Sequence, residues 1–95
     1  MRPLGPPHNR HLRAAQGWLD LGNQLEANRE LDAIAARLRS HPDVLQLRWQ
    51  ICAAAGNWEA CLDIGDSLIL WAGDDPQSWL RRARSLHKLG IRPQP

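Results

Sequence analysis

Two cysteines on either side of a glycine are the residues of this sequence best placed for chemistry. Cys52 and Cys61 flank the segment AAAGNWEA, and a turn at Gly56 would bring their thiols close together. Such a pair could form a disulfide, take part in redox chemistry or supply two ligands to zinc. Zinc would need two more ligands, and no histidine lies between them. Since both fall at apolar positions of a helical pattern, we expect small buried hydrophobes, with a redox pair as the alternative.

The other side chains that could do chemistry are scattered. The histidines stand at His8, His11, His41 and His87, and only the first two are close together, near the start of the chain. We expect them to be solvated. The serines have no neighbouring base, and Glu59, Asp63 and Asp66 are spaced as a solvated helix face. We therefore expect no catalytic site, no bound metal, no cofactor and no small-molecule substrate.

The composition is that of one small soluble domain. The chain has 95 residues, 43% hydrophobic and 23% charged, with five tryptophans and neither phenylalanine nor tyrosine. A chain of this length buries only about 60–70% of its unfolded surface, which disfavours a deep active-site cavity. No apolar run is long enough for a signal peptide or a membrane span. With only two cysteines, these features lead us to expect a cytoplasmic protein without a membrane partner.

Charge is unevenly distributed along the second half of the chain. Between Trp49 and Leu80 there are acids but no lysine or arginine, and between Arg81 and Arg92 there are bases but no acid. Two explanations stay open. Neighbouring helices could present complementary faces, or the basic segment could bind an acidic partner. A net charge of +2 is too small to indicate a polyanion partner by itself.

The sequence repeats with a constant period. Gly22, Gly56 and Gly90 are spaced by 34, as are Pro42 and Pro76. Glycine after an apolar helix end adopts a left-handed turn at little cost, and the following Asn23 or Asn57 would cap the next helix. Apolar spacing of three and four residues then predicts five helices. They cover about 9–21, 24–39, 43–55, 58–72 and 76–89.

The apolar residues of each predicted helix lie on one face. On the last helix this face holds Trp79, Ala83 and Leu86, with Leu80 beside them. Gly17 and Gly65 lie inside helices, where glycine costs about 1 kcal/mol relative to alanine, so we expect close helix approach at both. We also expect the last helix to cap the array with a polar outer face. That face consists of Arg81, Arg82, Arg84, Ser85 and Lys88.

A helix–turn–helix unit of this period, with proline at its boundary, resembles the tetratricopeptide repeat. Two registers are conceivable. The segment WLDLGNQL matches the family's Trp-x-x-Leu-Gly-x-x-Tyr phrase with Leu for Tyr, which would place Gly22 in mid-helix. We choose the other register, in which the three glycines form the turn within each unit, because all three units satisfy it. The segment NWEACLDI is similar to bacterial versions of the repeat, although Gly65 replaces an expected aromatic residue.

The resemblance implies an all-α fold in which antiparallel helix hairpins stack as a short right-handed superhelix of about five helices. It covers about two and a half repeats. The expected parts are a disordered lead at 1–7, a repeat domain at 8–90 with units of about 8–41, 42–75 and 76–90, and a tail at 91–95.

The resemblance also implies a concave groove that binds a protein or a peptide. Some relatives clamp a partner's terminal carboxylate with Lys, Asn and Arg, but only Arg81 matches that pattern here, so we reject this specificity. Basic residues at the C-terminal end of this groove would favour a partner with acidic character. The groove residues carried over from the family are Gln16, Leu19, Gln46, Gln50, Leu80, Arg84, His87 and Lys88.

Two other functions remain as alternatives. Open ends of the array could stack, making the chain a structural, self-associating module, so we expect a monomer or a weak homo-oligomer. Nucleic acid could bind the bases of the last helix, but four charges would release few counterions, and we regard this partner as disfavoured.

Overall fold

The computed structural model describes residues 4–90. Within them there is no strand, and the predicted all-α class is confirmed. Parts of the predicted lead and tail, at 1–3 and 91–95, lie outside the described residues, while Leu4 packs against the core. The elements are α1 (His8–Asp20), α2 (Gln24–Asp32), the 3-10 helix η1 (Ala36–Leu38), α3 (Pro42–Ala54), α4 (Trp58–Ala72) and α5 (Pro76–Lys88).

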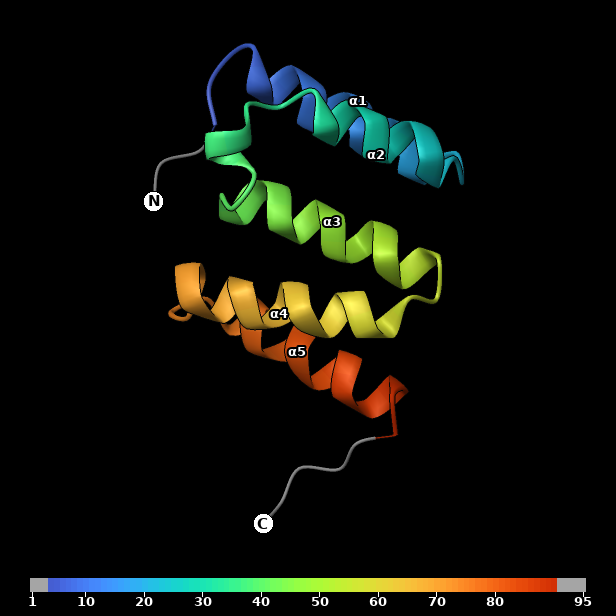
Figure 1. The fold of residues 1–95 in the computed structure, drawn as a ribbon, viewed down its shortest axis with the longest axis vertical. Helices are drawn as coiled ribbons and strands as arrows, with labels where there is room; N and C mark the ends of the chain where they lie inside the picture. Colours follow the sequence, from blue (N-terminus) through green and yellow to red (C-terminus); the bar gives the residue numbers. More distant parts are fainter. Residues whose placement is uncertain (1–3, 91–95) are drawn as a thin grey trace.

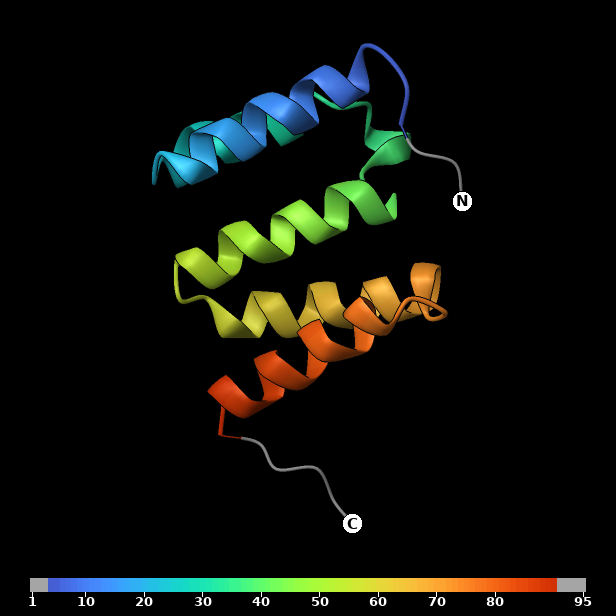
Figure 2. The same cartoon turned by 180° about the vertical axis from the view of Figure 1, so that it is seen from behind.

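The helices stack along the long axis of the molecule, with α1 and α2 at one end and α5 at the other (Figures 1 and 2). Consecutive helices run in opposite directions, and the closest packing joins α1 to α2, α3 to α4, and α4 to α5. The dimensions are 45 × 29 × 18 Å. Along the shortest axis α1 lies behind α2 in Figure 1 and in front of it in Figure 2, and every helix has exposed residues.

The three repeated glycines adopt the same turn. Gly22, Gly56 and Gly90 have φ of 79°, 73° and 76°, the left-handed region that glycine adopts without steric cost. After the first, the amide of Asn23 donates to the carbonyl of Trp18 at 2.8 Å. After the second, the amide of Asn57 donates to the carbonyl of Cys52 at 2.9 Å. Both bonds close the preceding helix, so the turn positions predicted from the glycine spacing are confirmed.

The two predicted caps also start their helices, and α3 and α5 have side-chain caps of their own. Asn23 and Asn57 accept from the amides three residues on, at 3.1 and 3.3 Å. Asp75 caps α5 through the amide of Gln77, with Pro76 in the first turn. His41 caps α3 by accepting from the amide of Asp43 at 3.0 Å, although histidine is a weaker cap than serine. The observed helix bounds therefore differ from the predicted ones by one residue at most, except at the end of α2.

The prediction of one continuous helix over 24–39 is wrong. The second helix ends at Asp32, and Ala35 is extended, with φ −52° and ψ 137°, before the short η1. The side chain of Arg39 donates to the carbonyls of Asp32 at 2.9 Å and Ile34 at 3.3 Å. These bonds satisfy acceptors that the interrupted helix leaves free. The bend still directs Ile34 into the core.

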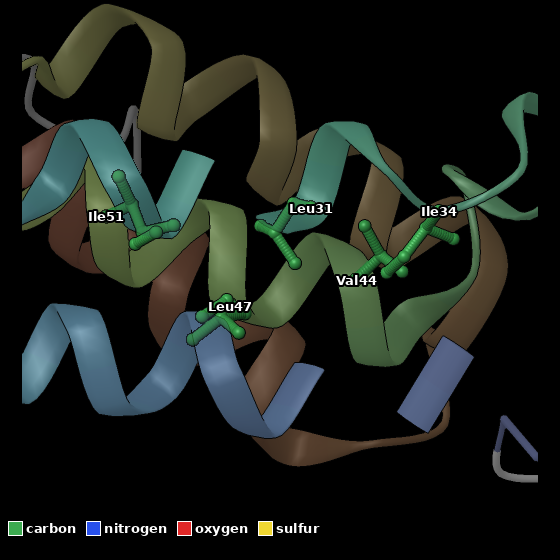
Figure 3. Close-up of a cluster of buried hydrophobic side chains, with 7 residues drawn as sticks. Leu31, Ile34, Val44, Leu47 and Ile51 are labelled. Carbon is green, nitrogen blue, oxygen red and sulfur yellow. The ribbon is translucent and has the colours of Figure 1, made fainter. Parts of the chain in front are cut away.

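The main core lies between the first three helices. Leu31, Ile34, Val44, Leu47 and Ile51 meet there (Figure 3), together with Ala15 and Ala27. Burying each of the larger side chains contributes about 1.5–3 kcal/mol. This cluster holds α1, α2 and α3 together, while a different set of contacts attaches α5.

Candidate functional site

The outward face of α5 exposes several apolar side chains along a groove. Trp79 is 52% exposed and Leu80 is 58% exposed, Ala83 is exposed, and Leu86 is half-buried. A groove of about 1110 Å³ follows this face and continues to Gly73 and Asp74 in the turn before the helix. We call Trp79, Leu80, Ala83 and Leu86 the open face.

The inner side of α5 carries small polar residues instead of apolar ones. Ser78 and Ser85 are fully buried. The hydroxyl of Ser78 donates to the carbonyl of Ala72 at 2.9 Å, and the hydroxyl of Ser85 accepts from the indole Nε1 of Trp49 at 3.0 Å. Because these hydroxyls are hydrogen-bonded, they can be buried without a large desolvation cost. The two serines, two helical turns apart, therefore determine which side of α5 faces inward.

This orientation contradicts the predicted polar cap. The sequence predicts Ser85 on the outer face, yet it is fully buried, while Trp79 and Ala83, predicted to pack inward, are exposed. The reason is the contact with α4. A Cβ on Gly65 would lie 3.2 Å from the Cα of Arg82, so the glycine permits the close approach predicted for it. At Gly17 the same prediction is wrong, since nothing lies within 4 Å of a Cβ placed there.

Equivalent positions of the repeat show why the open face is unusual. Ala15 of α1 is 0% exposed in a cluster with Ala27 of α2, and Trp49, one period further along the chain, is 6% exposed. The ring of Trp49 meets that of Trp58 of α4 edge-on at 6.1 Å between centroids. The next equivalent position is Ala83, which no described helix covers. α1 and α3 are thus packed against another helix at this place, whereas no helix of residues 4–90 packs on Ala83.

Two cations on one side of α5 lie over aromatic rings of the preceding helices. The guanidinium of Arg84 lies 5.9 Å from the centre of the Trp49 ring, and the ammonium of Lys88 lies 5.7 Å from that of Trp58. These cation–π contacts orient the two long side chains while leaving them exposed. On the other side, Arg82 forms an ion pair with Asp66 of α4 at 2.8 Å. The explanation of complementary helix faces holds for this pair, and Arg84 and Lys88 are oriented by aromatic rings.

The turn before α5 fixes the position of its first aromatic side chain. The indole Nε1 of Trp79 donates to the carbonyl of Gly73 at 2.7 Å. This bond anchors the polar edge of the ring, and half of the indole remains exposed. An exposed tryptophan held in one orientation is suited to a contact surface, since little side-chain entropy remains to be lost on binding.

The eight predicted groove residues fall in several environments. Leu80 and His87 line the α5 groove, whereas Arg84 and Lys88 lie over the rings of Trp49 and Trp58. Gln16 donates to Asp20 at 2.9 Å. Leu19 packs against the main core, and Gln46 and Gln50 are half-buried on α3. Two α5 members of the set therefore line the groove, together with Trp79, Ala83 and Leu86, which the apolar pattern assigns to the core.

The two thiols lie in a protein interior. Cys61 is fully buried and its sulfur donates to the carbonyl of Trp49 at 3.6 Å, whereas Cys52 is half-buried. Burial raises the pKa of Cys61 to about 11, and the neighbouring Cys52 adds to the rise. Burial also raises the pKa of Cys52, with Arg48 acting in the opposite direction. Both thiols are thus protonated at neutral pH, a state that disfavours nucleophilic and redox chemistry.

Other ionisable groups take structural partners. His11 Nδ1 lies 3.0 Å from a carboxylate oxygen of Glu30, which joins α1 to α2, so the prediction that His11 is merely solvated is wrong. Arg48 pairs with Asp32 at 2.6 Å and thereby joins α3 to α2. Within residues 4–90 no three His, Cys, Asp or Glu side chains converge as a metal site would require.

Comparisons with protein-family models, curated proteins and solved structures found no match to this chain. Helices long and apolar enough to cross a membrane are absent from the described part of the chain.

Proposed function

We propose that this chain is a non-catalytic protein-binding module built from tetratricopeptide-like repeats, and that it binds its partner through α5. The observation that carries the proposal is the open face, on which Trp79 and Leu80 are each more than half exposed. A contiguous apolar surface rimmed by polar residues is typical of a protein interaction site.

The repetition of the fold supports the type of module. The left-handed glycine turns recur once in each period, and the same backbone hydrogen bond closes the helices before Gly22 and Gly56. Stacked helix pairs present extended surfaces to other proteins, because each helix contacts only its neighbours and keeps one side in solvent. A binding role therefore needs no buried active site.

The charges beside the open face support a partner with acidic character. Arg84, one helical turn after Leu80, and Lys88, one turn further along, are exposed, and either could pair with a carboxylate. The predicted groove along α1 and α3, with Gln16, Gln46 and Gln50, would extend this surface. Nucleic acid is a weaker candidate, because Arg82 already pairs with Asp66 and few cations remain to contact phosphates.

Site-specific photo-crosslinking in the native cell tests the proposal. A photoreactive residue is placed at His87, beside the open face, and at Glu59 on α4 as the matched exposed control. We expect discrete protein adducts from position 87 that disappear when Ala83→Glu is added, and no such adducts from position 59. Adducts that are the same from both positions, or that persist in Ala83→Glu, would refute the proposed function.

A further inference from the structure

We propose that the open face of α5 receives an amphipathic helix from another protein, with acidic residues along the edge that meets Arg84 and Lys88. This inference rests on the proposed function and deepens it by naming the chemistry of the partner. The proposed function alone does not specify a helix, because a protein-binding surface could equally accept an extended peptide or a second copy of the chain.

A helix is the occupant that the molecule itself places at equivalent positions. Ala15 is buried in a cluster with Ala27 of α2, and Trp49 is buried against Trp58 of α4 together with Ser85 of α5. Ala83 stands at the same repeat position and is small enough for another helix to approach closely. Leu80 and Leu86, three residues before and after Ala83, provide the apolar stripe that a helix of matching pattern would bury.

The charge of the occupant follows from the charge of α5. This helix carries three arginines and one lysine and no acid, and α4 already packs on it through an acidic residue, Asp66, paired with Arg82. Arg84 and Lys88 lie one helical turn apart, so carboxylates at a spacing of three or four residues on an incoming helix could meet both. An acid-flanked helix would thus repeat on the open face the pairing that α4 makes with Arg82.

Charge argues against a second copy of this chain. Two α5 helices packed antiparallel around Ala83 would bring the Arg84 side chains of both copies to the same flank of the contact, because a two-fold axis through Ala83 keeps each residue on its own side. Like charges at such a contact repel. The asymmetry between a purely basic α5 and an acidic partner removes this conflict, and we therefore assign the face to a different protein.

Two synthetic helical peptides test the inference. Each is about 18 residues long. At about 1.5 Å per residue, such a peptide forms a helix longer than α5. Both carry the same leucine–alanine stripe, flanked in one by glutamate and in the other by lysine. Fluorescence anisotropy of the labelled peptides at low salt measures binding to the full chain. We expect the glutamate peptide to bind about tenfold more tightly than the lysine peptide, a ratio equivalent to about 1.4 kcal/mol.

Three variants establish where the peptide binds. Ala83→Glu should weaken binding of the glutamate peptide at least tenfold, whereas Leu25→Glu, at a 62% exposed leucine of α2, should leave it unchanged. Arg84→Glu combined with Lys88→Glu should reverse the preference between the two peptides. Circular dichroism verifies that each variant is folded.

Other outcomes would overturn the inference. Equal affinity for both peptides would show that charge does not select the partner. Absence of binding to either peptide would show that the open face does not receive a helix. Light scattering that shows dimers of the chain which Ala83→Glu dissociates would identify a second copy as the occupant. If the peptides fail but crosslinking at position 87 succeeds, this inference fails and the proposed function stands. Failure of the crosslinking with peptide binding intact would refute the proposed function and, with it, the inference that the face receives a protein partner.

Discussion

The indole N–H of Trp49 donates a hydrogen bond to the hydroxyl of Ser85 at 3.0 Å, and this bond joins α3 to α5. The Ser85 hydroxyl in turn donates to the carbonyl of Arg81 at 2.9 Å. Both side chains are buried, so the indole N–H depends on the Ser85 hydroxyl for its acceptor. The pair holds the polar side of α5 inward and thereby leaves the apolar side outward.

Replacing Ser85→Ala should lower the free energy of unfolding by about 1–3 kcal/mol, because the buried indole N–H loses its acceptor. Urea denaturation measures the change, and Ser67→Ala is the control, since that hydroxyl bonds only within α4. A double-mutant cycle with Trp49→Phe isolates the pair. A loss no larger than that of Ser67→Ala would show that the hydrogen bond does not hold α5.

Ala15 and Ala83 offer a matched test of which helix faces are covered. Ala15→Leu should destabilise the chain by about 1–3 kcal/mol through overpacking against α2. Ala83→Leu should change stability by no more than about 0.5 kcal/mol, because the position is exposed. Thermal or urea denaturation of the two variants provides the comparison. A large destabilisation by Ala83→Leu would mean that the face is already occupied.

Gly17 and Gly56 should respond to alanine with opposite signs. Neither has an atom within 4 Å of an added Cβ, so backbone conformation alone decides the outcome. Gly17→Ala should stabilise α1 by about 0.5–1 kcal/mol, because alanine is the better helix former. Gly56→Ala should destabilise by about 1–2 kcal/mol, because its φ of 73° strains an L-residue. Melting temperatures that move in the same direction would contradict the turn assignment.

The thiol of Cys61 should make stability fall at high pH. Its pKa is raised from 9.0 to about 11, so the folded state holds the proton more tightly than the unfolded state. The resulting stabilisation is complete below pH 9 and is lost as pH rises from about 9 to 11, with a limiting slope of about 1.4 kcal/mol per pH unit. Because the sequence has one lysine and no tyrosine, few other groups titrate there.

Urea denaturation between pH 7 and 11 measures this dependence. In Cys61→Ala, the free energy of unfolding should fall with pH only by the weaker contribution of Cys52, whatever the absolute stability of the variant. Cys52→Ala is the matched control. An unchanged slope in Cys61→Ala would show that the thiol does not cause the effect.

The positions of the turns could be predicted because they depend on local chemistry. Gly22 and Gly56 each need a left-handed φ, and the asparagine that follows each needs only the amide three residues on. Both requirements depend on a few adjacent residues. Their regular recurrence along the chain indicated which residues form the turn within each predicted helix pair. The start of α5 follows for the same reason, from Asp75 and Pro76.

The orientation of α5 could not be predicted, because apolar periodicity does not specify which side of a helix is covered. Trp79, Ala83 and Leu86 form an ordinary amphipathic pattern, and in most helices such a face is buried. The signal against it was a second stripe of small residues, Ser78 and Ser85, two helical turns apart. Its importance emerges only when Trp49, distant in sequence, supplies the donor for Ser85.

The end of α2 was missed for a similar reason. Leu31, Ile34 and Leu38 maintain helical spacing, yet the chain bends at Ala35 and uses Arg39 to satisfy the carbonyl groups. Alanine and arginine both favour helix, so no local residue indicates a break. The bend results from tertiary packing that brings Ile34 to the core.

The most direct test of the central claim is an NMR titration of the isotopically labelled chain with the glutamate-flanked peptide. If the open face is the binding surface, the largest amide shift changes will fall within α5, from Gln77 to Lys88, and in the neighbouring turn at Gly73 and Asp74. Amides of α1 and α2 at the far end of the molecule will remain unchanged. Shift changes centred on α1, α2 or α3, with α5 unaffected, would contradict the account.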